Sequence, residues 1–189
     1  MVFQRNPLTS GNGDSRIHKS PTAPYQRILL VNPCMDAIGA EFMMEDVPLR
    51  LEYLAAYVRP HVEAVEVADL IKEGKPLSYY LEHFQPDLVG VTLNYISTHR
   101  TSLLLAEEAK QYGADVVFGG YLATALDKDF ALDPNVDYVV RGEGEQTLLE
   151  LIERRPLDEV LGITFARDGE VVETGHRPNI EDLDQLPFP

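Results

Sequence analysis

The stretch PDLVGVTL, residues 86–93, decides the fold class of this 189-residue chain. A proline and an aspartate, which are typical of a turn, precede an almost unbroken apolar run. Such a run is typical of a strand buried on both faces of a parallel sheet, because a strand with one wet face alternates apolar and polar residues. The run RILLVNP at residues 27–33 has the same character and predicts a second buried strand over 28–31.

Three further strands and five intervening helices complete the pattern. The strands are expected over residues 62–68, 116–118 and 138–140. Helices are predicted from Pro48 to about Val58, then over 76–84, 98–112, 123–130 and 142–152. Strand–helix alternation repeated five times indicates a doubly wound α/β fold with a five-stranded parallel sheet, of the flavodoxin-like (Rossmann-like) kind.

The two ends of the chain differ in composition from this central α/β domain, which we place at residues 25–155. Residues 1–24 are rich in Gly, Pro, Ser and Asn without periodicity, which predicts a disordered leader. Residues 156–176 hold Asp168-Gly169 between two apolar runs, which predicts a β-hairpin appendage. Residues 177–189 are polar and end in LPFP, which predicts a linker toward a domain absent from this sequence.

Charge and cysteine content exclude several classes of function. The net charge is −15, which disfavours nucleic acid as a partner, because binding to it depends on Lys and Arg neutralising phosphates. The single cysteine, Cys34, excludes an intrachain disulfide and a multi-cysteine iron–sulfur site within this chain. No run of about 20 apolar residues is present to span a bilayer. We therefore expect a cytoplasmic protein.

A ligand of this fold is expected at one edge of the sheet, because open parallel sheets bind ligands outside the carboxyl ends of their strands. The loops that follow the strands there are rich in glycine and in small polar residues, which suit a large polar ligand. The candidate cofactor-binding residues are Asn32, Pro33, Asp36, Gly39, Thr92, Asn94, Tyr95, Ser97, Thr98, Gly119, Gly120, Tyr121, Thr124, Arg141, Gly142, Glu143 and Gly144.

Two of these loops have a purely structural alternative. Gly119-Gly120 is either a simple turn or a surface without Cβ atoms on which a bulky ligand lies. Glu143 and Glu145 complement the dipole of the helix that they begin, and they also disfavour a phosphate at that helix end. Neither G-x-G-x-x-G after the first strand nor G-x-x-x-x-G-K-[ST] occurs, so a nucleotide-processing enzyme is disfavoured.

No catalytic or metal-ligating set is predicted. Of the five histidines only His99 falls near the expected ligand edge, and a single histidine there is more often a helix-start residue than a ligand. Cys34 has no base to pair with in the sequence pattern, and a lone thiol is more often a small apolar residue than a nucleophile.

Taken in order, several stretches resemble the N-terminal cobalamin-binding domain of cobalamin-dependent radical S-adenosylmethionine enzymes, of the methyltransferase and anaerobic tetrapyrrole cyclase types. The matching stretches are RILLVNP at 27–33, PLRLEYLA at 48–55, PDLVGVT at 86–92, FGGYLAT at 118–124, DYVVRGEGE at 137–145, GIT at 162–164 and LDQLPFP at 183–189. The resemblance covers residues 27–189 and implies a corrinoid over the carboxyl ends of the strands, with its nucleotide tail inserted on the sheet side.

The resemblance also implies what this chain does not carry. In that family a downstream domain, in cis or in trans, binds a [4Fe–4S] cluster through C-x-x-x-C-x-x-C and cleaves S-adenosylmethionine, and that motif is absent here. Other cobalamin-binding proteins use D-x-H-x-x-G after the first strand to place a histidine on cobalt. Here the loop reads Asp36-Ala37-Ile38-Gly39, so the lower axial ligand is not expected to be a histidine of that motif.

Two other functions fit the same fold. One is a non-enzymatic sensory or interaction module that has no cofactor. The other is a phosphoacceptor receiver domain, which needs an Asp at a strand end. The third strand ends in Thr92-Leu93-Asn94, which argues against a receiver.

Overall fold

A computed structural model describes residues 23–34 and 47–189. Its strands are β1 (Arg27–Asn32), β2 (Ala64–Asp69), β3 (Leu88–Thr92), β4 (Asp115–Gly119), β5 (Tyr138–Val140), β6 (Ile163–Arg167) and β7 (Glu170–Glu173). Its α-helices are α1 (Leu49–Val58), α2 (Leu77–Phe84), α3 (His99–Gln111), α4 (Tyr121–Ala125), α5 (Asp127–Ala131) and α6 (Glu145–Ile152). Single 3-10 turns lie at Arg59–His61, Ile96–Thr98, Leu157–Glu159 and Leu183–Gln185.

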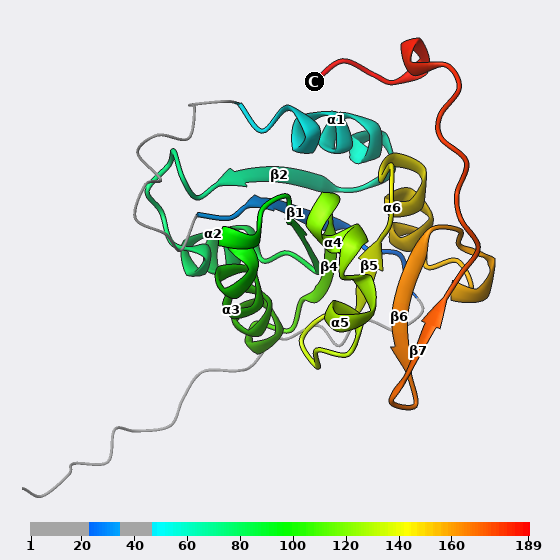
Figure 1. Cartoon of the computed structure of the whole chain (residues 1–189). Coiled ribbons are helices and arrows are strands. Elements are labelled where there is room, and N and C mark those ends of the chain that lie inside the picture. The colour runs from blue at the N-terminus through cyan, green and yellow to red at the C-terminus, as the bar shows by residue number, and fades with distance from the viewer. Residues whose placement is uncertain (1–22, 35–46) are drawn as a thin grey trace, which may run out of the picture.

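All seven strands form one sheet in the order β2-β1-β3-β4-β5-β6-β7 (Figure 1). β1 to β5 are parallel, which confirms the predicted doubly wound α/β class. β6 and β7 are antiparallel and extend the same sheet beyond β5. The strand count therefore differs from the expected five.

The hairpin joins the sheet because β5 has an edge that needs a partner. Val139 pairs with Thr164 and Val140 with Ile163, and the backbone N–H of Arg141 donates to Gly162 O at 2.8 Å. An Asp-Gly turn predicts only that two strands pair with each other. It carries no signal of pairing with a strand more than twenty residues away.

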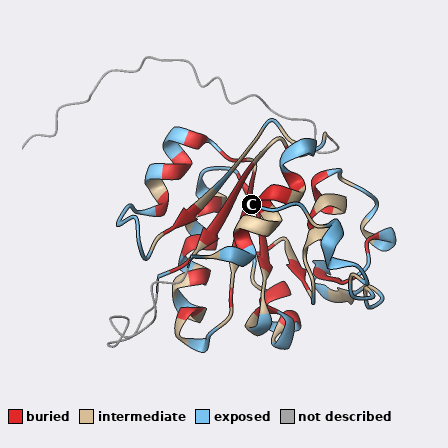
Figure 2. Ribbon diagram, turned by 90° about the horizontal axis from the view of Figure 1, so that it is seen from above, coloured by how far each residue is buried: buried red, intermediate tan, exposed pale blue. Residues whose placement is uncertain are grey.

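Helices cover both faces of the sheet, and each face has its own core. Alternate residues of β1 divide between them, since Leu29 and Val31 pack on one side and Ile28 and Leu30 on the other. Helices α2 to α5 cover the first face, whereas α1 and α6 cover the second (Figure 1). The central strands are buried along their apolar residues, as the apolar runs predicted, and are partly exposed at their ends (Figure 2).

The helix expected over residues 123–130 is two short helices, α4 and α5. They separate at Leu126, whose backbone angles of φ −121° and ψ 31° are not helical. The break lets Asp127 begin α5 with its carboxylate turned toward the hairpin. There it accepts a hydrogen bond of 2.6 Å from the buried Thr164 hydroxyl.

Residues 174–189 leave the hairpin and run along α6 toward α1 (Figure 1). The guanidinium of Arg177 binds Glu150 of α6 and lies 3.2 Å from Gln146 Oε1. The ring of Phe188 lies 6.4 Å from the ring of Tyr53 in α1. The expected linker is thus held against the second helical layer in this structure.

Candidate functional site

The loops after β3 and β4 are joined into one surface at the carboxyl edge of the sheet. Leu93 N donates to Gly119 O at 2.7 Å, and Leu122 N donates to Leu93 O at 2.9 Å. The Asn94 side chain links the loops a third time, because its Oδ1 accepts from Tyr121 N at 3.3 Å. Its amide nitrogen also donates to Thr92 Oγ1 at 3.1 Å, so this side chain is held in place from both sides.

The loop after β5 is tied to the same surface. Gly142 N donates to Thr124 Oγ1 at 3.2 Å, across from β4 to β5. Tyr95, Tyr121 and Thr124 are exposed on this surface, and Ser97 is half-buried. The structure therefore brings together the candidate residues of three loops, as the parallel topology predicted.

The two glycines that follow β4 have different reasons to be glycine. Gly120 has φ +103°, and a Cβ there would lie 2.6 Å from Leu93 O, so the packing of the two loops requires it. Gly119 needs no such explanation, because a Cβ built on it would meet nothing within 4 Å in the described part of the chain. The half-buried backbone at Gly119 is therefore bare on the side where a Cβ would point, and a bulky ligand can lie there.

The end of β1 lies beside the end of β2. Asn32 Nδ2 donates to Asp69 Oδ1 at 3.1 Å, and the same oxygen accepts from the backbone N–H of Ile71. Asp69 is 6% exposed, and its Oδ2 has no hydrogen-bond partner among the described residues. A buried carboxylate oxygen without a donor is uncommon and fits a site that receives one from a ligand.

The sequence of this chain matches the B12 binding domain family over residues 35–152. The chain belongs to that family. The resemblance predicted from its motifs is therefore confirmed, and so is the corrinoid as the ligand class of this B12-binding domain.

Curated relatives are longer proteins. The B12-binding domain is 31% identical over 172 residues to an uncharacterized methyltransferase of Pyrococcus horikoshii, covering 86% of this chain and 37% of that protein. It is 30% identical to the anaerobic magnesium-protoporphyrin IX monomethyl ester cyclase of Cereibacter sphaeroides, covering 85% of this chain and 28% of the cyclase. The chain thus spans about a third of the length of such relatives.

Solved structures share the fold. The cobalamin-dependent S-adenosylmethionine radical enzyme OxsB with aqua-cobalamin bound superimposes with a TM-score of 0.70 at 22% identity, covering 88% of this chain and 24% of OxsB. The radical S-adenosylmethionine methyltransferase TsrM from Kitasatospora setae, with cobalamin and a [4Fe–4S] cluster bound, gives 0.65 at 21% identity, covering 86% of this chain and 31% of TsrM.

Several candidate residues of the B12-binding domain have side chains engaged elsewhere. The Arg141 guanidinium donates to the carbonyls of Ile163 and Thr174 and lies 3.6 Å from Asp127, so it faces the hairpin. Glu143 Oε2 accepts from Ile180 N at 2.6 Å and holds the C-terminal segment.

Three more candidates are packed against other parts of the protein, and two lie outside the described residues. Gly144 packs on α1, since a Cβ there would lie 3.3 Å from Leu54. Thr98 and Pro33 are buried, and the Thr98 hydroxyl donates to Tyr95 O at 2.8 Å. Asp36 and Gly39 lie outside the described residues.

Sequence reasoning missed Asp69, because its strand was expected to end one residue earlier and the loop after it was not considered. Its position in the sequence could have identified Asp69, because an acidic residue at the end of a strand lies at the ligand edge of such a sheet.

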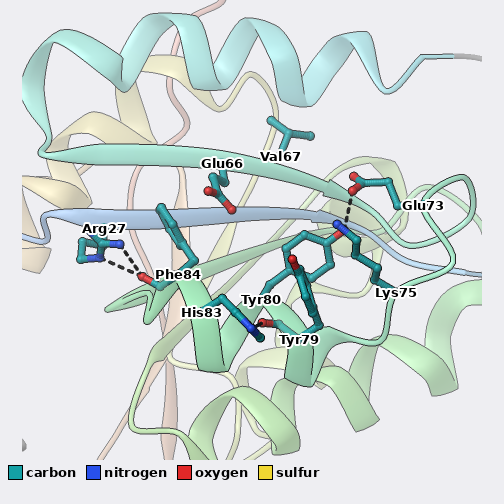
Figure 3. A pocket seen from close by; sticks show the side chains of 9 residues that line it. All are labelled: Arg27, Glu66, Val67, Glu73, Lys75, Tyr79, Tyr80, His83 and Phe84. Atoms are coloured by element: carbon teal, nitrogen blue, oxygen red, sulfur yellow. Dashed lines mark hydrogen bonds between the residues drawn. The ribbon is translucent and has the colours of Figure 1, made fainter.

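A separate cavity of about 440 Å³ lies between the edge strand β2 and α2 (Figure 3). Several of its polar groups contact one another. Tyr80 OH donates to Glu73 Oε2 at 2.6 Å, and Lys75 Nζ lies 4.4 Å from the centre of the Tyr79 ring. It does not include any of the candidate residues.

Within the described residues no helix is long and apolar enough to cross a bilayer, and no group of three or more His, Cys, Asp or Glu is placed to hold a metal ion.

Proposed function

We propose that this domain binds cobalamin across the loops after β1, β3, β4 and β5 and holds it for methyl transfer or radical chemistry done by an iron–sulfur domain. Membership of the B12 binding domain family gives the ligand class. The observation that supports this location of the cobalamin site is the bare backbone at Gly119. It lies at the edge where ligands of open parallel sheets bind.

The residues of the ligand edge divide by the kind of contact they offer. Gly119 offers a flat backbone surface, and Asp69 offers an acceptor to a hydroxyl or amide N–H of the ligand. Asn94, Tyr95, Ser97, Tyr121 and Thr124 offer polar groups and rings along the exposed side. When bound, cobalamin supplies the cobalt–carbon chemistry. The protein groups bind it, orient it and keep water from one of its faces.

The lower axial position of cobalt is not filled by a histidine from the loop after β1, because that loop contains none. His99, the histidine near the edge, packs its ring against Phe130 with the ring centres 5.2 Å apart. Phe130 belongs to the core on the face covered by α2 to α5, so this contact holds the His99 ring against that core. A tail base displaced from cobalt would then leave the lower position to water or to a weaker donor.

The catalytic half of the system is a radical domain that binds a [4Fe–4S] cluster and S-adenosylmethionine, in cis or in trans. This is supported by the length of the relatives, of which this chain spans about a third. OxsB and TsrM are likewise about three to four times longer than the part that superimposes. A cytoplasmic location, without nucleic acid as a partner, remains a prediction from the sequence.

The test is a titration of the purified chain with hydroxocobalamin and with methylcobalamin, followed by visible absorbance and by retention through gel filtration. We expect retained cobalamin whose spectrum shows the tail base displaced from cobalt. Retention with the base still coordinated would keep the binding function and overturn the placement of the tail. Folded protein that retains none at tens of micromolar would favour the cofactor-free interaction module.

A further inference from the structure

The charges along the ligand edge are unevenly distributed. Carboxylates lie at both ends of it, with Asp69 at the end of β2 and with Glu143 and Glu145 before and at the start of α6. Between them stands Arg50 in the first turn of α1, with its guanidinium carbon 5.7 Å from the centre of the Tyr121 ring. Tyr121 is 76% exposed and follows Gly119 by two residues, so Arg50 lies against the loop that carries the Gly119 backbone.

Arg50 differs from the other guanidinium at this edge. Arg141 is engaged by Asp127, Glu173 and two backbone carbonyls. Among the described residues no carboxylate forms an ion pair with Arg50, and its guanidinium lies over the Tyr121 ring. A contact of an exposed guanidinium with an aromatic ring is weak, so Arg50 can turn toward an anion at little cost.

Cobalamin has one group that matches this charge. Its nucleotide tail carries a phosphodiester with a single negative charge, whereas the amide side chains of the corrin ring are neutral. Guanidinium donors pair with phosphate oxygens in a fixed geometry. The glutamates that begin α6 repel a phosphate at the other end of the edge.

We propose that Arg50 binds the phosphodiester of the nucleotide tail and thereby sets the direction in which the corrinoid lies on the edge. This inference rests on the proposed function. Arg50 is a binding residue on this account, and the tail phosphate lies on the Arg50 and Tyr121 side of the edge.

The test compares cobalamin with cobinamide, which has the same corrin ring but lacks the nucleotide and its phosphate. Dissociation constants are measured by absorbance titration for the wild-type chain and for Arg50→Gln, which keeps most of the side-chain length and removes the charge. We expect Arg50→Gln to weaken cobalamin binding by roughly tenfold and to leave cobinamide binding within about twofold of wild type. Rising salt should weaken cobalamin binding to the wild type more than to the variant.

Two further variants complete the design. Arg50→Lys keeps the charge and should recover part of the affinity for cobalamin. Arg59→Gln removes an exposed arginine just beyond the other end of α1, and it should leave both dissociation constants unchanged. Circular dichroism checks that all variants are folded.

The outcomes separate the inference from the proposal beneath it. Unchanged cobalamin binding by Arg50→Gln, or an equal loss for cobalamin and cobinamide, would overturn the phosphate contact while the binding function stands. If the folded wild-type chain binds neither corrinoid, the proposed function fails and this inference falls with it.

Discussion

At the scale of single residues, two residues of the same type have different roles in this structure. Gly120 is required by the loop packing, whereas Gly119 leaves open space that the fold itself does not use. The same distinction separates Arg141, whose side chain supports the hairpin, from Arg50, whose side chain lies at the ligand edge. The two members of each pair have the same residue type, so the sequence does not distinguish their roles. Only the contacts around each residue do.

The glycine pair gives a matched prediction. Gly120→Ala should lower the free energy of unfolding by about 2 kcal/mol, because alanine at this positive φ is strained and its Cβ meets Leu93 O. Gly119→Ala should change that free energy by less than about 1 kcal/mol and should weaken cobalamin binding several-fold. Urea denaturation and absorbance titration measure the two effects. A Gly119→Ala variant that binds cobalamin like wild type would show that the ligand does not approach this backbone.

At the scale of elements, the hairpin is the part whose role the sequence did not reveal. β6 closes the edge of the short strand β5, and its Thr164 is fully buried against Asp127. Arg141 adds contacts to carbonyls on both sides of the hairpin. β6, β7 and the start of α5 therefore form one supporting unit behind the loop after β5.

Thr164→Val tests this unit, because valine has the shape of threonine and removes only the hydroxyl. The buried Asp127 carboxylate loses a donor, so we expect the free energy of unfolding to fall by about 2 kcal/mol, measured by urea denaturation. In an Asp127→Asn background the same substitution should cost clearly less. Equal costs in the two backgrounds would mean that the hydrogen bond does not stabilise the hairpin.

At the scale of the whole molecule, the two edges of the sheet have different tasks. The carboxyl edge carries the ligand loops, and the amino edge carries a half-buried ionic network. Asp115 accepts hydrogen bonds from Tyr25 OH and from Arg154 at 3.0 Å, and it lies 3.3 Å from Lys110 Nζ. Lys110 in turn lies 2.8 Å from Asp137. The network joins the chain before β1 to β4, β5, α3 and the end of α6.

This network predicts how stability depends on pH. Burial acts to raise the pKa of Asp115, but the hydrogen bond from Tyr25 and the charges of Lys110 and Arg154 outweigh it and lower that pKa below its usual value. The stabilisation from Asp115 is therefore complete above its unfolded pKa of about 4 and is lost as the pH falls through the lower folded pKa. Asp115→Asn should lower the free energy of unfolding by about 2 kcal/mol at pH 7, and the difference from wild type should shrink below about pH 4.

Asp137 changes stability with pH in the opposite direction to Asp115. The prediction is therefore made for the difference in stability between Asp115→Asn and wild type. Burial raises its pKa despite the hydrogen bonds from Lys110 and from Val116 N–H. Its contribution is largest at low pH and is lost as the pH rises through that raised pKa. Both proteins carry Asp137, so most of its contribution cancels when Asp115→Asn is compared with wild type from pH 3 to 7. The remainder is the part of the raised Asp137 pKa that comes from the charge of Asp115. A difference that does not change over this range would contradict its role.

The sequence by itself determined the parallel sheet and the helices between its strands, and it predicted the edge at which a ligand binds. These features follow from local patterns, since unbroken apolar runs mark strands buried on both faces and the carboxyl ends of parallel strands meet at one edge. The order and spacing of seven short stretches between residues 27 and 189, among them those around Gly119-Gly120 and Arg141–Glu145, carried the resemblance to cobalamin-binding domains.

Only the tertiary structure decided which side chains at that edge are used by the protein itself and which are left available to a ligand. Arg141, Glu143, Gly144 and Gly120 are used by the hairpin, the C-terminal segment, α1 and the neighbouring loop. Asp69 and Arg50 are brought to the edge from β2 and α1. The physical reason is that pairing of β6 with β5, and contacts between loops far apart in the chain, depend on three-dimensional neighbours that a local pattern does not encode.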